Sequence, residues 1–354
     1  MDTHFPEPIF HPRSLWPYYE PTDLIELPGL ARRARVARVF VKLENRRPLG
    51  NFKSLGGLVA GLRALARHAG VGSLEELKRH GAGLPALLCA SEGNHGLAVA
   101  AAARLAGTTA CVYLPLEVSP RRAARIEALG SEVIRIDGSY DDAVSAAKAA
   151  AAVGAGLLIP DTSEDPDDPV VADVMEGYAL IARELESQFG GSDRDRPSHV
   201  FVQAGVGGLA AALAQGIEDG WRWPVRLLTV EPANAACVAS ALGKGRPLPV
   251  EGDLKTSAVM LACGVASAPA VRVLLRFGAR GIAVCEAELD AAVQALLETG
   301  GPATTHSGAA GVAGLLHVSD DPALRDLHGL DASSRVLLLV TEGQPSALPD
   351  SSTG

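Results

Sequence analysis

Apolar and polar positions follow two alternating spacings along most of the chain. Short runs of β-branched and aromatic residues, such as residues 39–41, are typical of buried strands. Apolar residues three or four positions apart, as in 55, 58, 62 and 65, predict helices. The expected strands are residues 39–44, 84–90, 110–114, 132–136, 156–159, 199–203, 227–230, 281–284 and 335–340. The expected helices are a short one within 23–38, then 53–69, one starting at 73, 93–106, 119–129, 140–152, 170–188, 209–215, 235–242, 268–277, 286–298 and 309–317. This strand–helix alternation predicts an α/β fold of open parallel sheets with flanking helices.

Composition narrows the possible partners. The net charge of −9 argues against nucleic acid, which would call for a basic surface. No uncharged apolar run is long enough to span a membrane, and the first residues lack the pattern of a signal peptide. The five cysteines are widely spaced and form no CxxC pair. We therefore expect a cytoplasmic protein with reduced cysteines, no membrane association and no metal site.

One lysine stands at an unusual place in this pattern. Pro48 and Gly50 end the strand at 39–44, and an apolar helical face begins at Leu55. Lys53 then lies near a helix N-terminus, which disfavours a positive charge, beside the apolar Phe52. The neutral amine favoured there is the nucleophile of Schiff-base chemistry. On this stretch alone, a surface lysine whose stem packs on Phe52 is the alternative.

Two further strand-to-helix turns carry polar or glycine residues. Ser91, Asn94 and His95 lie where open α/β sheets bind ligands, at the carboxyl end of a strand. Asn94 can donate to a phenolate oxygen, and His95 is either catalytic or a helix-start histidine that makes one backbone bond. The second turn consists of Gly205, Val206, Gly207, Gly208 and Leu209. Its glycines and the helix N-terminus that follows suit a single phosphate group, although a plain strand-to-helix turn remains the alternative.

The order of these features points to one ligand. Thr341 follows the last expected strand and can bind a ring nitrogen. A lysine, an asparagine turn, a phosphate-sized glycine turn and a threonine match the aldehyde, phenolate, phosphate and pyridine nitrogen of pyridoxal 5'-phosphate. The sequence therefore predicts this cofactor.

Several motifs extend the match over residues 40–345. They are Asn-Phe-Lys-Ser-Leu-Gly-Gly at 51–57, Gly-Asn-His-Gly at 93–96, Asp-Gly-Ser-Tyr-Asp-Asp-Ala at 137–143, Asp-Thr-Ser at 161–163, Gln-Ala-Gly-Val-Gly-Gly at 203–208, Ser-Gly-Ala at 307–309 and Thr-Glu-Gly at 341–343. In these motifs the chain resembles the fold-type II pyridoxal phosphate enzymes, which are tryptophan synthase β-like, and within them the diaminopropionate ammonia-lyases.

The resemblance implies a role for each of these residues. Lys53 would form the Schiff base, Phe52 would stack on the ring, Asn94 would bind the ring hydroxyl and Thr341 the pyridine nitrogen. Residues 205–209 would hold the phosphate. It also implies a small mobile domain at 86–160, a large cofactor-binding domain at 1–85 and 161–354, and a homodimer. Substrate contacts would come from Ser91, His95, Tyr140, Asp161 and His306.

The implied reaction is α,β-elimination from an amino-acid substrate, 2,3-diaminopropionate or a close β-substituted analogue, giving pyruvate and ammonia. Two positions depart from the family pattern. Glu92 replaces an aspartate that serves these lyases as the base for the D-isomer, and His306 replaces a glutamate. A shift of about 1 Å can cost roughly a hundredfold in rate. Either the β-substituent of the substrate differs, or Glu92 repacks and His306 points elsewhere.

Two other classes of function stay open. A serine/threonine-type dehydratase or a β-replacement synthase would use the same cofactor, although such dehydratases usually carry Ser or Ala in place of Glu92. A non-catalytic protein on this fold is the other alternative, and the intact set of Lys53, Asn94 and the glycine turn argues against it.

Overall fold

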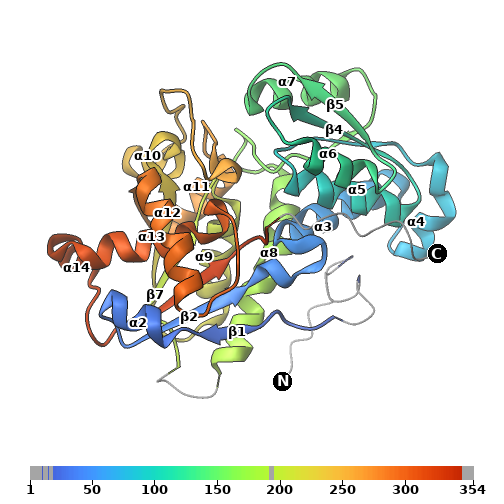
Figure 1. Ribbon diagram of the computed structural model, residues 1–354. Coiled ribbons are helices and arrows are strands. Elements are labelled where there is room, and N and C mark those ends of the chain that lie inside the picture. Colours follow the sequence, from blue (N-terminus) through green and yellow to red (C-terminus); the bar gives the residue numbers. More distant parts are fainter. Residues whose placement is uncertain (1–9, 11–14, 16–18, 191–194, 345–354) are drawn as a thin grey trace. The chain divides into compact units, whose positions relative to one another are not determined.

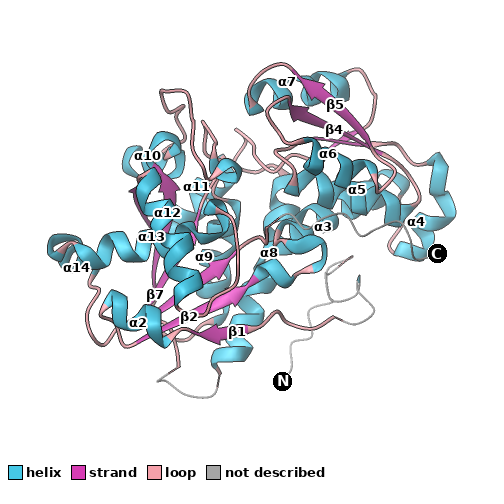
Figure 2. Cartoon of the chain, viewed as in Figure 1, coloured by secondary structure: helices cyan, strands magenta, loops and turns pink. Residues whose placement is uncertain are grey.

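The computed structural model describes residues 10, 15, 19–190 and 195–344, which form two compact units (Figure 1). Among the described residues, unit 1 contains Lys53–Asp161, Pro169–Leu180 and the residues before Thr22. Unit 2 contains Thr22–Phe52, Thr162–Asp168 and the described chain from Ile181 onward. Each unit has its own sheet with helices beside it (Figure 2), as the α/β prediction requires.

Unit 2 is built on a six-stranded sheet. Its order is β1-β2-β10-β7-β8-β9, and all neighbours are parallel except the edge strand β1. The strands are β1 (Leu24–Glu26), β2 (Arg38–Leu43), β7 (His199–Gln203), β8 (Arg226–Pro232), β9 (Arg280–Val284) and β10 (Arg335–Val340). The central strands β7 and β10 are almost wholly buried, which explains why their sequences are continuous apolar runs.

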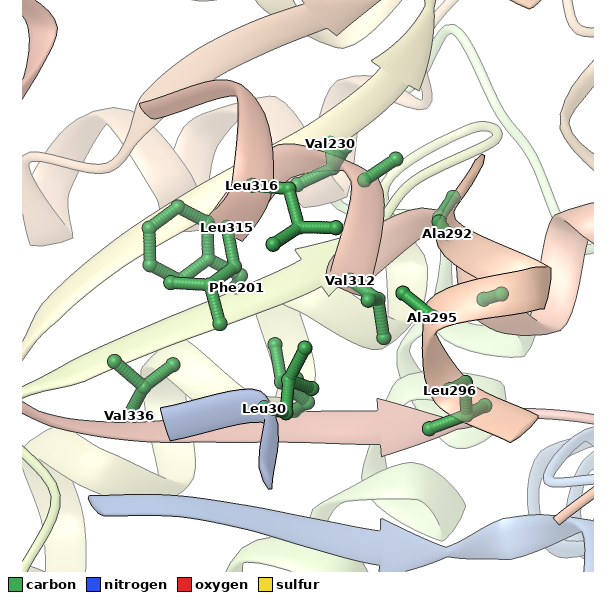
Figure 3. Packing of buried hydrophobic residues seen from close by; sticks show 14 of the residues in the cluster. Leu30, Phe201, Val230, Ala292, Ala295, Leu296, Val312, Leu315, Leu316 and Val336 are labelled. Atoms are coloured by element: carbon green, nitrogen blue, oxygen red, sulfur yellow. The ribbon is translucent and has the colours of Figure 1, made fainter. Parts of the chain in front are cut away.

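Helices cover this sheet and supply its core. They are α2 (Pro28–Ala34), α9 (Gly208–Gly220), α10 (Cys237–Lys244), α11 (Ala268–Phe277), α12 (Glu286–Glu298), α13 (His306–Asp320) and α14 (Pro322–His328). Figure 3 shows Phe201 and Val230 of the sheet packed with Leu315 and other apolar side chains of α12 and α13. The core therefore lies directly under the strands whose carboxyl ends carry the glycine turn and Thr341.

A cluster of four charged side chains is also buried in unit 2. Lys42 Nζ lies 2.6 Å from Glu184 Oε2, and Arg47 bridges Glu44 and Glu184 at 2.6 and 2.7 Å. All four side chains are at most 1% exposed, and their formal charges cancel. The Lys42, Glu44, Arg47 and Glu184 cluster fixes the chain just before the turn that leads to Phe52 and Lys53.

Unit 1 has a four-stranded parallel sheet of order β5-β4-β3-β6. The strands are β3 (Leu87–Ala90), β4 (Ala110–Pro115), β5 (Glu132–Ile136) and β6 (Leu157–Leu158). Its helices are α3 (Lys53–Ala69), α4 (Leu74–His80), α5 (Asn94–Ala106), α6 (Pro120–Glu127) and α7 (Tyr140–Ala152), and α8 (Pro169–Phe189) belongs to it as far as Leu180. Ser139 and Asp142 form a capping box that starts α7.

Helices α3 and α5 pack against each other through small residues. A Cβ atom at Gly57 would lie 2.7 Å from Ala98 Cβ, and one at Gly61 would lie 2.8 Å from Ala102 Cβ. Distances below 3.0 Å do not occur for real Cβ atoms, so the two helices need glycine at these two positions. This contact explains why α3 belongs to the same compact unit as residues 86–160. Unit 1 therefore includes more of the chain than the segment expected for a small domain.

Near the N-terminus the structure differs from the expected single helix within 23–38. Leu24–Glu26 pair antiparallel with β2, and the helix is restricted to Pro28–Ala34. Pro28 suits the first turn of a helix, because the backbone N–H that proline lacks would have no partner within the helix there. The helix α14 was not anticipated. Within the described chain, no helix combines the length and the apolar character needed to cross a bilayer.

Candidate active site

Lys53 is the first residue of α3, and its amine is paired with a carboxylate. Lys53 Nζ lies 2.7 Å from Asp161 Oδ2, and the Tyr140 hydroxyl donates to Asp161 Oδ1 at 2.7 Å. The Lys53 side chain is 23% exposed and that of Asp161 only 8%. Three residues that the sequence proposed separately are therefore brought together within unit 1.

The carboxylate in this group is stabilised in its charged form. Burial alone would raise the pKa of Asp161, but the Lys53 charge, the nearby His95 and the Tyr140 hydroxyl outweigh it and hold the pKa well below its ordinary value. A carboxylate at this distance favours the ammonium form of its partner. This carboxylate acts on the Lys53 amine in the opposite direction to the helix N-terminus and the burial that the sequence suggested.

The turn after β3 is shaped by a serine and a glycine. Ser91 Oγ accepts hydrogen bonds from the backbone N–H groups of Gly93 and Gly96, both at 2.8 Å. Gly93 has φ +132°, and a Cβ atom there would lie 3.1 Å from Arg122 Cδ, so glycine is required. These bonds place Asn94 at the first position of α5, where its side chain is largely buried.

His95 makes a backbone hydrogen bond, as the structural interpretation of that residue predicts. Its Nε2 atom lies 2.8 Å from the Ile159 carbonyl oxygen, which can only accept, so Nε2 carries the proton. Burial lowers the pKa of His95. The bond holds the chain two residues before Asp161, so His95 supports the Lys53–Asp161 pair through the backbone.

Glu92 lies in the same turn and is only partly exposed. Burial raises its pKa to about 8, although the Lys53 charge acts in the opposite direction. The neighbouring Asp161 adds to the rise. Glu92 therefore holds its proton at neutral pH far more readily than an ordinary glutamate.

The glycine turn of unit 2 leads into α9. Gly207 has φ +97° and precedes Gly208, the first residue of the helix, and no side chain caps this end. A Cβ atom at Gly205 would lie 3.1 Å from Cys263 Sγ, and one at Gly207 3.2 Å from Val238 Cγ2. The Val206 carbonyl accepts from Ser267 N at 3.0 Å. Close packing therefore keeps the turn small and leaves the first N–H groups of a 13-residue helix without a side-chain cap.

Thr341 lies directly after β10 in the same unit. It is 3% exposed, its Oγ1 lies 3.0 Å from Gln203 Nε2, and its carbonyl accepts from Phe52 N at 3.1 Å. An isolated bridge between Asn51 and Glu342 continues this pairing. Phe52, the residue before Lys53 in the chain, is thus fixed to the backbone of Thr341.

His306 points toward a neighbouring helix. Its Nε2 atom lies 2.8 Å from Asp290 Oδ1 of α12, and both side chains are exposed to a third or more. The structure thus gives His306 a partner on α12, and its substrate contact stays a prediction. Among the described residues, no group of three or more His, Cys, Asp or Glu side chains is arranged to hold a metal ion.

Two buried polar residues near these turns were given no role from the sequence, although Gln203 opens the motif at 203–208. Gln203 contacts Thr341, and Glu231 accepts from the backbone N–H groups of Val238 and Ala239, both at 2.7 Å, at the start of α10. Burial raises the pKa of Glu231 to about 8, although these two donors act against the rise. Both residues stand at or near the carboxyl ends of expected strands, where open α/β sheets bind ligands, and this position could have marked them as candidates.

Comparison with known proteins assigns the family. The family model for pyridoxal-phosphate dependent enzymes matches residues 15–342, and the chain belongs to this family. The chain is 30% identical, over 93% of its length and 87% of the relative, to diaminopropionate ammonia-lyase of Salmonella typhimurium. It superimposes with a TM-score of 0.84 and 28% identity on the Escherichia coli diaminopropionate ammonia-lyase solved with D-serine, covering 94% of this chain and 87% of that one.

A second group of relatives has another activity. The chain is 28% identical to the biosynthetic L-threonine dehydratase of Haemophilus influenzae over 78% of its own length and 48% of that protein. The shorter coverage and lower identity separate this relative from the ammonia-lyase.

Proposed function

We propose that this chain is a pyridoxal phosphate-dependent ammonia-lyase that acts on 2,3-diaminopropionate or a close β-substituted amino acid. The Lys53 amine at the start of α3, 2.7 Å from the Asp161 carboxylate, carries this proposal. The similarity to a diaminopropionate ammonia-lyase over 93% of the chain supports it. In the net reaction, 2,3-diaminopropionate and one water give pyruvate and two molecules of ammonia.

The residues present fit the cofactor. The start of α9 offers uncapped backbone N–H groups next to a turn in which side chains are excluded, which suits one phosphate group. A buried threonine hydroxyl at the end of β10 suits a ring nitrogen, and an amine beside a carboxylate suits an aldehyde. These three features match three of the polar groups of pyridoxal phosphate.

Each part of the cofactor then has a proposed holder. Lys53 would hold the aldehyde carbon, the turn at 205–209 the phosphate, and Thr341 the ring nitrogen. Asn94 would donate to the ring hydroxyl, and Phe52 would lie against the ring. When bound, the cofactor supplies an electron sink for the carbanion formed at the substrate Cα.

The chain's own groups would move the protons. Lys53 Nζ would take the Cα proton of an L-substrate as a general base. Asp161 Oδ2 would stabilise the resulting ammonium, and the Tyr140 hydroxyl would keep Asp161 charged through its hydrogen bond to Oδ1. Glu92 is the proposed base for a D-substrate, because it carries a carboxyl group where the ammonia-lyases have aspartate.

The experiment is a panel of amino acids assayed with the purified holoenzyme for pyruvate, ammonia and 2-oxobutyrate. We expect pyruvate and two equivalents of ammonia from diaminopropionate, and much slower release from serine and threonine. Rapid 2-oxobutyrate formation from threonine would favour the dehydratase, whose sequence similarity to the chain makes it the second candidate. The appearance of a condensation product with an added thiol would favour a β-replacement synthase.

The lysine assignment has its own test. The holoenzyme should absorb at about 410–420 nm, a band expected when the cofactor is joined to an amine. Lys53→Ala should abolish this band, whereas Lys78→Ala, which removes an exposed lysine of α4, should leave it unchanged. If Lys53→Ala retained the band, another lysine would hold the cofactor.

Assembly and location follow the same proposal. We infer a cytoplasmic homodimer from the family resemblance and from the five free cysteines. Sedimentation equilibrium of the holoenzyme should give twice the chain mass of 36.5 kDa, and a monomer at assay concentrations would contradict this.

A further inference from the structure

Gln203 occupies the end of β7, one of the two central strands of the unit 2 sheet. It is 3% exposed, and its Nε2 atom faces three backbone carbonyl oxygens. The distances are 3.3 Å to Ser307 O, 2.9 Å to Gly308 O and 3.1 Å to Leu339 O. The fourth neighbour is Thr341 Oγ1, at 3.0 Å. One amide group thus joins the start of α13 to the end of β10.

The orientation of this amide follows from its surroundings. Carbonyl oxygens only accept hydrogen bonds, so the atom facing three of them must be the NH₂ group. The other end is restricted as well. A Cβ atom at Gly311 would lie 2.9 Å from the Phe201 carbonyl oxygen and 3.2 Å from Gln203 Oε1, so α13 packs closely against both the β7 backbone and the amide.

This orientation decides what the Thr341 hydroxyl can do. An amide nitrogen cannot accept a hydrogen bond, so the hydroxyl proton cannot point at Gln203. Thr341 Oγ1 accepts from Gln203, and its own proton remains available to another acceptor. Without the amide, no neighbouring donor would fix which way the hydroxyl proton points.

We propose that Gln203 is a positioning residue that sets the polarity of the Thr341 hydroxyl, so that Thr341 donates to an unprotonated ring nitrogen of the bound cofactor. The proposal rests on the proposed function, because it takes Thr341 as the partner of that nitrogen. Gln203 would not touch the cofactor and would act through the threonine alone.

The first test uses the wild-type holoenzyme loaded with cofactor labelled with ¹⁵N in the ring. The nitrogen chemical shift should be that of an unprotonated, hydrogen-bonded pyridine. Thr341→Val should move the shift toward the value of a pyridine without a donor, and Thr341→Ser should restore it. A pyridinium shift in the wild type would overturn the proposal.

The second test removes the amide. Gln203→Met keeps the length of the side chain without a donor, and it should reproduce the nitrogen shift of Thr341→Val. It should also weaken cofactor binding about three- to tenfold, the usual effect of one neutral hydrogen bond. The double variant should show no further change of the shift. Gln294→Met, on the exposed side of α12, is the matched control and should alter neither quantity.

A second variant covers the case in which Gln203→Met does not fold. Gln203→Leu removes the amide with a shorter apolar side chain, so the same change of the nitrogen shift is expected. If Thr341→Val changes the shift while Gln203→Met or Gln203→Leu folds and leaves it unchanged, the proposed role of Gln203 is wrong. A holoenzyme that lacks the absorbance band, or keeps it in Lys53→Ala, would instead contradict the proposed function.

Discussion

Lys53 Nζ lies 2.7 Å from Asp161 Oδ2, across 108 residues of sequence. The amine is therefore held by a carboxylate that is itself buried and bonded to the Tyr140 hydroxyl. This arrangement gives the lysine a defined direction and a partner that stabilises it whenever it carries a proton.

Asp161→Asn keeps the shape of the side chain but removes its charge. We expect the turnover of diaminopropionate to fall by about 10²–10⁴, the range typical of a general acid–base group, with the cofactor absorbance retained. Tyr140→Phe removes one hydrogen bond and should cost only about tenfold. Steady-state kinetics of both variants provide the comparison, and equal activity of Asp161→Asn and wild type would show that Lys53 works without this partner.

Glu92 should make the rate with a D-substrate depend on pH. Its pKa is raised to about 8 by burial, and only the ionised carboxylate can take a proton. The rate should therefore rise with pH through about 8, and Glu92→Gln should remove this rise together with most of the activity on the D-isomer. The L-isomer, for which Lys53 is the proposed base, should be affected less. A D-isomer rate that is flat between pH 6 and 9 would contradict the assignment.

The same pKa predicts how stability changes with pH. The folded-state pKa of Glu92 lies above the unfolded value of 4.5, so folding takes up a proton between the two values. The contribution of Glu92 to the free energy of unfolding should be greatest below pH 4.5 and decline as the pH rises through about 8. Urea unfolding of Glu92→Gln should show a weaker decline, whereas Glu75→Gln, at an exposed position, should follow the wild type.

The contact between α3 and α5 should tolerate no added methyl group. Gly57→Ala and Gly61→Ala would place Cβ atoms 2.7 and 2.8 Å from alanine methyl groups, so each should destabilise the protein by about 1–3 kcal/mol despite the better helix propensity. Gly243→Ala in α10 is the matched control. It meets nothing within 4 Å and should stabilise by about 0.4–1 kcal/mol. Thermal unfolding measures the stability of the three variants. Gly57→Ala and Gly61→Ala proteins as stable as the wild type would contradict the close contact between α3 and α5.

The buried charges of unit 2 should be intolerant of losing one member. Glu184→Gln leaves Lys42 and Arg47 with one carboxylate between them, and we expect a loss of about 3–5 kcal/mol. Glu298→Gln breaks an exposed pair with Arg33 at 4.0 Å and should change stability by at most about 0.5 kcal/mol. Denaturant titrations of both variants test this, and a small effect of Glu184→Gln would mean that water reaches the cluster.

Much of the fold follows from local patterns. The predicted strands at 132–136, 199–203 and 335–340 and the helices at 53–69, 140–152 and 286–298 have the observed bounds, because apolar spacing and capping residues act within each segment. The strand Leu24–Glu26 was missed, since three residues at a sheet edge are fixed by pairing with β2 rather than by their own sequence.

The site could be predicted only in part for the same reason. Lys53, Asn94 and the glycine turn are recognisable from local chemistry. Three contacts depend on segments far apart in the chain: the pairing of Lys53 with Asp161, the four acceptors around Gln203 Nε2 and the pairing of His306 with Asp290. No spacing along the sequence encodes these contacts, because the fold alone brings the partners together.

Lys42 has a practical consequence for chemical labelling. Its amine is wholly enclosed and bonded to Thr22 O at 2.7 Å and to Gln188 Oε1 at 3.0 Å, in addition to Glu184. An acylating reagent therefore reaches Lys42 only when unit 2 opens, whereas exposed lysines such as Lys255 react in the folded protein. The rate at which the Lys42 peptide becomes acylated, followed by mass spectrometry, therefore reports how often unit 2 opens.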